Sequence, residues 1–198
     1  MNRKVFKQTP FGLVGIIWTV AGGYPKICRV VLPKATLSAE RRVFQFYPDA
    51  RADTCVEIES VADAIKGILE GSNPEISLAA ADLTACSAFQ RRVLIAQHRI
   101  PPGSVSSYQL IGNHLGKSNA ARAVGNALAS NPFPIIVPCH RTIRSDRRLG
   151  GYGGGIGMKR ALCEQEGIRF DDAGRVVCNR FYYQEQDSSL LTRLGMTK

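Results

Sequence analysis

A cysteine and a histidine stand side by side at Cys139 and His140, directly after Pro138 and the apolar run 135–137. Three apolar β-formers ahead of a proline predict a short buried strand that ends at Pro138, because proline has no N–H for a sheet ladder. The thiolate is the nucleophilic form of cysteine, and a neighbouring base or cation lowers the pKa of a thiol. The pair is therefore a candidate nucleophile with its base. The alternative is a small buried cysteine beside an ordinary surface histidine.

Four short motifs surround this pair in a fixed order. They read Asn131-Pro132, Pro138-Cys139-His140-Arg141, Gly151-Tyr152-Gly153-Gly154-Gly155 and Glu166-Gly167. With these motifs, residues 89–170 resemble the O6-alkylguanine-DNA alkyltransferase family. One departure is Thr142, where the family usually has an aliphatic residue. We expect this change to affect the shape of the pocket and not the chemistry.

The resemblance implies DNA repair by direct reversal of damage. The alkyl group of O6-alkylguanine would move to Cys139, and because the resulting thioether is stable, each molecule would act once. This is the activity of a methylated-DNA–protein-cysteine methyltransferase, with alkylthymine left open as a second substrate. No metal and no organic cofactor are implied. The expected partner is double-stranded DNA, bound in its minor groove with the damaged nucleotide flipped out, and the protein is expected to be a monomer.

The resemblance also assigns roles to single residues. Glu166 would orient His140, which takes the proton of Cys139 through a water, in the logic of a nucleophile–base–orienter triad. Tyr108 would rotate the phosphate of the flipped nucleotide and donate its hydroxyl to the guanine ring, where it stabilises the negative charge that develops on the purine. The pocket would be formed by Thr142, Tyr152, Gly153 and Lys159, and the DNA contacts by Ser107, Ala121, Arg122, Ala123, Asn131 and Arg141. Without the resemblance, Tyr108 is typical of a core tyrosine and Glu166 of a surface residue.

Three helices must position these residues. Apolar spacing predicts helices over 89–96, 109–115 and 120–129, and the last two form a helix-turn-helix pattern around Gly116. The third holds five alanines and a single long cation, Arg122, so it has too few polar side chains to read a major groove. Its small residues would let it approach a minor groove while Arg122 fills the hole left by the flipped nucleotide. Alternatively, the alanines only pack against neighbouring helices and Arg122 is a solvated charge.

Positive charge is concentrated in the same part of the chain. The formal net charge is +10; residues 85–172 hold twelve Lys and Arg against five Asp and Glu, whereas residues 1–84 hold ten against nine. Four arginines, at 141, 144, 147 and 148, follow the Cys-His pair closely. This asymmetry suits a phosphate backbone as the partner. A basic surface that only keeps the protein soluble is the alternative.

The first part of the chain indicates a scaffold. Two apolar strands over 13–20 and 26–33, joined at Gly22-Gly23, predict a hairpin, and a helix over 61–69 ends at Gly71. Residues 44–47 are ambiguous. We expect an α+β fold with an N-terminal α/β domain at 1–84, to which the resemblance gives a ribonuclease H-like topology. A mainly helical domain with the helix-turn-helix follows at 85–172, then a terminal hairpin and tail at 173–198. The hairpin is expected to pair 168–170 with 176–178 across a turn at 171–174, and the tail to be loose after Gln184.

The cysteine pattern and the N-terminus indicate an intracellular protein. Six cysteines form neither a Cys-x-x-Cys pair nor a zinc-finger spacing, so we expect free thiols and predict no metal site. The basic N-terminus is not followed by the apolar core of a secretory signal, and no apolar run is long enough for a membrane span. The expected location is the cytoplasm, or the nucleus in a eukaryote.

Other functions are compatible with parts of the pattern. A helix-turn-helix suits a DNA-binding regulator, although the alanine-rich third helix argues against sequence reading. A lesion-sensing relative would flag alkylguanine without repairing it, but relatives of that type replace the cysteine. A cysteine hydrolase would need an oxyanion motif, and none is apparent in the sequence.

Overall fold

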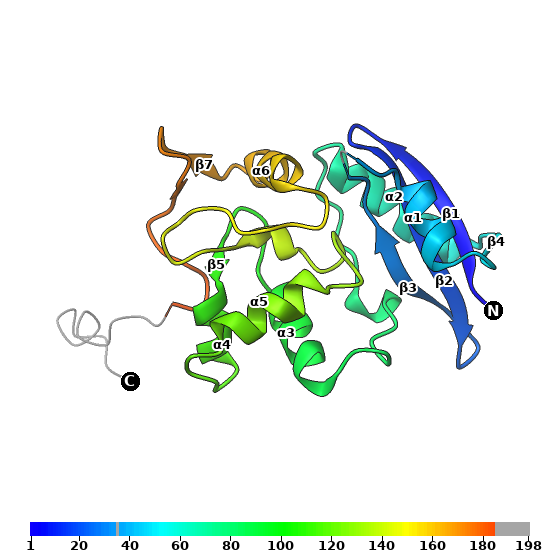
Figure 1. Ribbon diagram of the computed structural model, residues 1–198, viewed down its shortest axis with the longest axis horizontal. Coiled ribbons are helices and arrows are strands. Elements are labelled where there is room, and N and C mark those ends of the chain that lie inside the picture. Colours follow the sequence, from blue (N-terminus) through cyan, green and yellow to red (C-terminus); the bar gives the residue numbers. More distant parts are fainter. Residues whose placement is uncertain (35, 185–198) are drawn as a thin grey trace.

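The computed structural model describes residues 1–34 and 36–184. Within these ranges the fold is mixed α+β, with six α-helices and three small sheets. The first four strands and two helices lie together at one end of the molecule, and the remaining helices form the other end (Figure 1). The prediction of an α+β fold is confirmed in this form. The expected boundary at 84/85 stays a prediction.

The largest sheet comes from the first 52 residues. Its strand order is β3-β2-β1-β4, with β4 parallel to β1 and the other neighbours antiparallel. The predicted hairpin is confirmed: Gly22 and Gly23 have φ of 59° and 83° between β2 and β3, which is the backbone that a tight two-residue hairpin turn requires. The first strand was not expected from the sequence. The bounds are Arg3–Thr9 for β1, Gly12–Ala21 for β2, Tyr24–Val31 for β3 and Arg51–Ala52 for β4.

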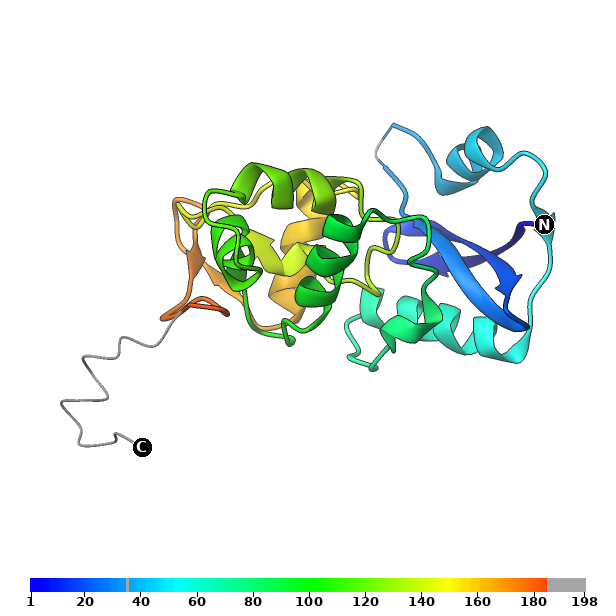
Figure 2. The same ribbon diagram turned by 90° about the horizontal axis from the view of Figure 1, so that it is seen from below.

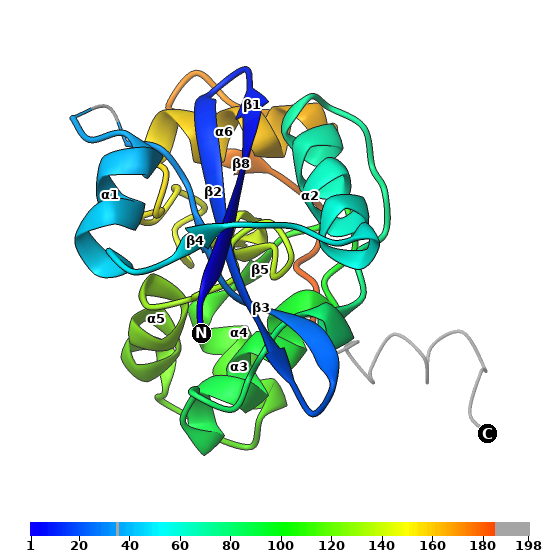
Figure 3. The same ribbon diagram turned by 90° about the vertical axis from the view of Figure 1, so that its right-hand side faces the viewer.

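The central part of strand β2, from Val14 to Trp18, is apolar and buried because helices cover both faces of the sheet. Ile17 packs with Val43 of α1 (Ala39–Phe46), whereas Ile16 and Trp18 belong to the cluster that holds Ile58 of α2 (Val56–Leu69). Successive side chains of a strand point to opposite faces, so neighbouring residues must face different helices. Figure 3 shows α1 and α2 on either side of the sheet.

The rest of the chain is mainly helical, as predicted. Helices α3, α4 and α5 pack together and α6 follows further along the chain, as Figures 1 and 2 show. Ser107 is the N-cap of α4, where its hydroxyl accepts a hydrogen bond from the Leu110 amide at 3.2 Å. The bounds are Ala88–His98 for α3, Tyr108–His114 for α4, Ala121–Ala129 for α5 and Ile156–Gln165 for α6.

Short strands and a terminal segment complete this part. Strand β5 (Ser106–Ser107) pairs with β6 (Thr142–Ile143), and β7 (Arg169–Phe170) pairs with β8 (Val176–Val177), which confirms the predicted terminal hairpin. Beyond the hairpin, the Tyr182 amide donates to the Val105 carbonyl at 2.8 Å. The chain therefore returns to support the start of α4. The predicted loose tail after Gln184 lies outside the described residues.

One core joins the two ends of the molecule. The Val30 amide on β3 donates to the Pro132 carbonyl at 2.8 Å, and Leu32 shares a buried cluster with Leu94 and Phe133. The sheet thereby holds the segment that leads to the Cys-His pair. Among the described helices, none has both the length and the apolar character needed to cross a bilayer.

The expected buried strand over 135–137 is wrong. Ile135 and Ile136 form a turn between Pro134 and Val137, and Ile135 has φ of +76°. A β-branched residue rarely adopts this conformation. The Val137 amide donates back to Phe133 at 2.8 Å, and the Cys139 amide donates to Val137 at 2.7 Å. The apolar side chains are buried as predicted, but the backbone curls and does not extend.

Candidate active site

Cys139 opens a short 3-10 turn, Cys139–Arg141, that runs into β6. Its side chain is half-buried and lines a cavity of about 310 Å³. Helix α5 and the glycine-rich loop supply most of the remaining wall. The residues that line the cavity are Lys34, Tyr108, Gly125, Leu128, Ala129, Cys139, Gly151, Tyr152 and Gly153. The thiol therefore faces a space large enough for a flat heterocycle.

The surroundings of Cys139 act on its pKa in opposite directions. Burial raises the pKa of the thiol, whereas a hydrogen bond from Asn131 and the positive charge of Lys159 lower it. Asn131 Nδ2 lies 3.4 Å from Sγ and 3.2 Å from the Val137 carbonyl oxygen. Burial is the largest of these effects, so the pKa stays above its ordinary value. A thiol in this state needs a base before it can attack.

His140 is arranged to be that base. Its Nε2 lies 2.8 Å from Oε1 of Glu166, and because a carboxylate only accepts, Nε2 carries the proton. The other ring nitrogen, Nδ1, is buried and has no hydrogen-bond partner among the described residues. Burial lowers the pKa of His140 although Glu166 opposes the change, so the ring is neutral near pH 7. The free Nδ1 lone pair is thus open to accept a proton.

Glu166 is fixed by Arg141 as well as by His140. The Arg141 guanidinium donates to both carboxylate oxygens at 2.7 to 3.0 Å, and its Nη1 donates to the Ile100 carbonyl at 2.6 Å. Burial raises the pKa of the Glu166 carboxyl, but the hydrogen bonds from His140 and Arg141 outweigh it and lower the pKa to about 2. Glu166 is therefore an anion at any physiological pH.

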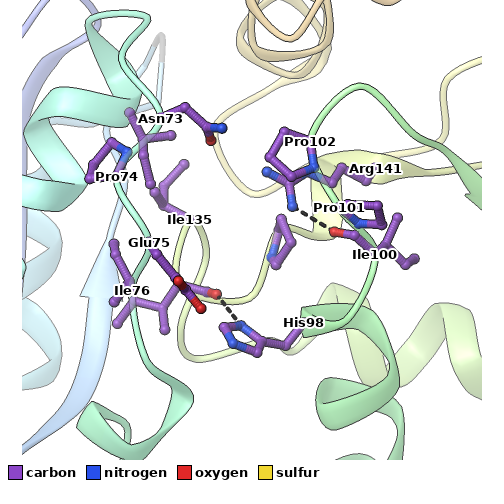
Figure 4. A pocket seen from close by; sticks show the side chains of 13 residues that line it. Asn73, Pro74, Glu75, Ile76, His98, Ile100, Pro101, Pro102, Ile135 and Arg141 are labelled. Atoms are coloured by element: carbon purple, nitrogen blue, oxygen red, sulfur yellow. Dashed lines mark hydrogen bonds between the residues drawn. The ribbon is translucent and has the colours of Figure 1, made fainter.

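The expectation that Arg141 contacts DNA stays a prediction, and in the structure its side chain turns inward to Glu166. Its side chain is only 10% exposed, and its donors are engaged with Glu166 and Ile100. Figure 4 shows Arg141 at the wall of a separate cavity of about 410 Å³, where the segment 73–76 faces His98 and the 100–102 turn. The same view shows His98, whose Nδ1 lies 2.9 Å from the Ile136 carbonyl oxygen. Arg141 thus supports the site from behind.

Two residues expected in the substrate pocket lie beneath it. Lys159 and Thr142 are both 0% exposed, and the Lys159 ammonium donates to the Thr142 carbonyl at 2.6 Å. The Thr142 hydroxyl bonds to Gln97, whose amide in turn donates to the Pro138 carbonyl at 2.7 Å. These contacts hold the turn that carries Cys139. Neither Thr142 nor Lys159 is among the residues that line the cavity, whereas Tyr152 and Gly153 are.

The residues expected to contact DNA divide into two groups. Arg122 and Ala123 are exposed on α5 and Ala121 is partly exposed. Ser107, which was also expected to contact DNA, is 4% exposed and caps α4. The Asn131 amide is engaged with Val137, Cys139 and Phe133, which makes it part of the turn. Of the six residues expected to contact DNA, Arg122 and Ala123 on α5 are the two that the structure leaves exposed.

Comparison with known proteins agrees with this site. A family model for the DNA-binding domain of 6-O-methylguanine DNA methyltransferase matches residues 88–168. The methylated-DNA–protein-cysteine methyltransferase of Methanothermobacter thermautotrophicus is 40% identical over 114 residues, which are 58% of this chain and 64% of that protein. Its counterpart from Mycobacterium bovis is 53% identical over 81 residues, 41% of this chain and 49% of that protein. The matched regions therefore span less than two thirds of the length of each of these two relatives.

A longer match comes from the counterpart in Mycolicibacterium paratuberculosis, which is 35% identical over 159 residues, 80% of this chain and 88% of that protein. The chain belongs to the methylated-DNA–protein-cysteine methyltransferase family. The crystal structure of Mycobacterium tuberculosis OGT in complex with DNA superimposes with a TM-score of 0.65 at 33% identity, covering 84% of this chain and 92% of that one. Similarity to this family therefore extends over most of the fold.

Other contributors to this methyltransferase-family site were missed by the sequence analysis. Gln97 belongs to none of the recognised motifs, and only the fold brings its amide within hydrogen-bond distance of the Pro138 carbonyl. Lys34 comes from the segment that the sequence analysis treated as scaffold. Leu128 and Ala129 were recognised only as parts of a helix, although the helical spacing of small residues was the signal that α5 approaches something closely.

Tyr108 depends on a glycine in the loop that faces it. A Cβ at Gly150 would collide with the Tyr108 hydroxyl and lie 3.2 Å from its Cζ, whereas a Cβ at Gly151 would meet nothing within 4 Å. We expect Gly150→Ala to displace the Tyr108 ring and to slow alkyl transfer about tenfold, a typical cost for a shifted positioning group. Single-turnover rates with alkylated duplex DNA measure the effect. Gly157→Ala is the matched control and keeps the normal rate, because Gly157 lies on α6 outside the cavity wall and a Cβ there would meet nothing within 4 Å. Equal rates for both variants contradict the prediction.

Proposed function

We propose that this protein repairs DNA by moving an alkyl group from O6 of guanine to Cys139, once per molecule. The observation that carries the proposal is the ordered chain of Glu166, His140 and a half-buried thiol at a cavity, with Nδ1 of His140 free. This is the nucleophile–base–orienter arrangement of a triad. The family relationship supports the same activity.

The reaction balances with the groups present. The proton of Cys139 passes to Nδ1 of His140, either directly or through a water, and the sulfur attacks the alkyl carbon. The carbon–O6 bond breaks, and its electron pair goes to the purine. The Tyr108 hydroxyl stabilises the negative charge that develops there, and the proton taken from the thiol restores a neutral guanine. The chain itself supplies each group in this sequence, and a thioether remains on Cys139.

DNA binding is proposed to involve α5. Its exposed surface carries small residues and Arg122, which suits close approach to a minor groove and insertion into the space left by a flipped base. In this proposal α4, the turn at Gly116 and α5 act as a helix-turn-helix, and the N-terminal sheet with its helices is a ribonuclease H-like support. We further propose that residues 1–84 and 85–172 act as two domains and that the protein works as an intracellular monomer.

The test is intact-mass analysis after mixing with duplex DNA that contains O6-methylguanine. We expect the protein to gain the mass of one methyl group, to stop there in excess DNA, and to carry it on the tryptic peptide with Cys139. Repeated turnover, a methyl group elsewhere, or no transfer would each refute the proposal. A sequence-specific regulator would instead give a footprint at a preferred site with no change in mass.

A further inference from the structure

Lys34 is held over the cavity by the segment that follows β3. The Lys34 amide donates to the Leu37 carbonyl at 3.1 Å, and the Leu37 amide donates back to the Lys34 carbonyl at 3.2 Å. Next to it, the Leu32 carbonyl accepts a hydrogen bond from Arg42 at 2.7 Å. These contacts hold the chain at Leu32 and at Lys34 itself, and Lys34 lines the cavity.

The glycine-rich loop packs against the same segment. A Cβ at Gly154 would lie 3.4 Å from Cδ1 of the buried Leu32 and would collide with Met158. The absence of a side chain at Gly154 therefore lets this loop approach the N-terminal half closely. As a result, one cavity is lined both by Lys34 and by Tyr152 and Gly153.

Lys34 is the charged residue in an otherwise neutral wall. The other lining residues are Cys139, two tyrosines, three glycines, Ala129 and Leu128. Lys34 is exposed, and none of the ion pairs in the described part of the chain includes it. A hydrated ammonium without a protein carboxylate beside it is free to bind an anion.

We propose that Lys34 binds the phosphodiester of the flipped nucleotide. This inference rests on the proposed function, because it takes the occupant of the cavity to be an alkylated nucleotide. When the base reaches Cys139, the sugar and its phosphates must stay outside, where an exposed cation on the wall meets them. Lysine binds phosphate as a point charge, and this contact requires less exact geometry than hydrogen bonds to the edge of a base. The N-terminal half then contributes directly to recognition and is more than a support.

The experiment compares two substrates that differ in the phosphate. One is duplex DNA with O6-methylguanine, and the other is free O6-benzylguanine, which has a purine and a reactive alkyl carbon but no phosphate. For Lys34→Met we expect duplex affinity to fall about three- to tenfold at 0.1 M salt, and the slope of log affinity against log salt to become shallower by about 0.9. Transfer from the free base should stay within about twofold of the wild type, because no phosphate contact is lost.

Two further variants complete the comparison. Lys34→Arg keeps the charge and should retain most of the duplex affinity. Lys66→Met removes one positive charge from α2, where Lys66 pairs with Glu70 away from the cavity, and should leave both substrates unaffected. A Lys34→Met protein that binds duplex normally, or that slows on both substrates equally, overturns the phosphate contact. Transfer by the wild type is measured first. No transfer by the wild type would refute the proposed function, whereas the variants test the Lys34 contact alone.

Discussion

Replacing Glu166 with glutamine is expected to slow alkyl transfer by about a hundredfold or more and to lower the free energy of unfolding by about 3–5 kcal/mol. The carboxylate accepts from His140 Nε2 and from two nitrogens of Arg141 at the same time. A glutamine has one oxygen for these donors, and its amide group would face the guanidinium. The substitution leaves Arg141 buried without its anion and removes the partner that orients His140.

The loss of stability should depend on pH in a defined window. The Glu166 pKa is lowered from an ordinary 4.5 to about 2, so the folded state favours the anion. Its contribution is fully present above pH 4.5 and is lost as the pH falls toward 2, and the shift corresponds to about 3 kcal/mol. The gap in unfolding free energy between the wild type and Glu166→Gln should therefore close on going from pH 5 to pH 2.

Denaturant unfolding at several pH values measures this gap, and Glu164 provides the control. Glu164 lies on the last turn of α6, two residues before Glu166, and pairs with Arg160. Both side chains of this pair are about half exposed. Exposed pairs contribute about 0–1 kcal/mol, so Glu164→Gln should change neither stability nor transfer by much. A gap for Glu166→Gln that stays constant across this range, or that matches the gap for Glu164→Gln, would contradict the assigned role of the carboxylate.

The fold was predictable where periodicity was strong and local. Strands β2 and β3 were recognised from apolar runs around two glycines, and α4 from its apolar spacing over 109–115. Strand β1 was missed because Val5 and Phe6 are its only apolar residues, so it shows neither an apolar run nor an alternation of apolar and polar residues. The 135–137 segment was wrong for the opposite reason: its composition favours a strand, but the tertiary structure imposes a turn with Ile135 at positive φ.

The site was predictable from its motif only in part. The short sequence separation of Cys139 and His140 and the match to Glu166 identified the reacting groups, and the structure brings His140 and Glu166 together. The motif also carried Arg141, but adjacency in sequence does not reveal which way a side chain points, and this one turns inward to Glu166. Lys34 lies 105 positions before Cys139, so only the packing of β3 against the Pro132 segment could place it.

Replacing Cys139 with alanine is expected to abolish alkyl transfer while leaving duplex binding within about threefold of the wild type. Cys139 is the one thiol among the described residues that line the cavity; the others are glycine, alanine, leucine, two tyrosines and Lys34. A thiol, once deprotonated, is a far stronger nucleophile toward an alkyl carbon than a protonated phenol or an ammonium. Burial raises the pKa of both tyrosines, which keeps their hydroxyls protonated. The exposed surface of α5 is unchanged by the substitution, so the DNA contacts proposed for Arg122 remain.

The measurement pairs intact mass with a binding titration on the same O6-methylguanine duplex. Cys55→Ala is the matched control, because Cys55 is also a half-buried free thiol but lies at the start of α2, away from the cavity. Its protein should gain one methyl group at the normal rate. The decisive contrast is between the two alanine variants: methylation of the Cys139→Ala protein would show that a different atom is the acceptor. Loss of transfer in both variants would instead indicate general damage to the fold. Only transfer in the Cys55 variant with none in the Cys139 variant fits a single nucleophile activated by His140.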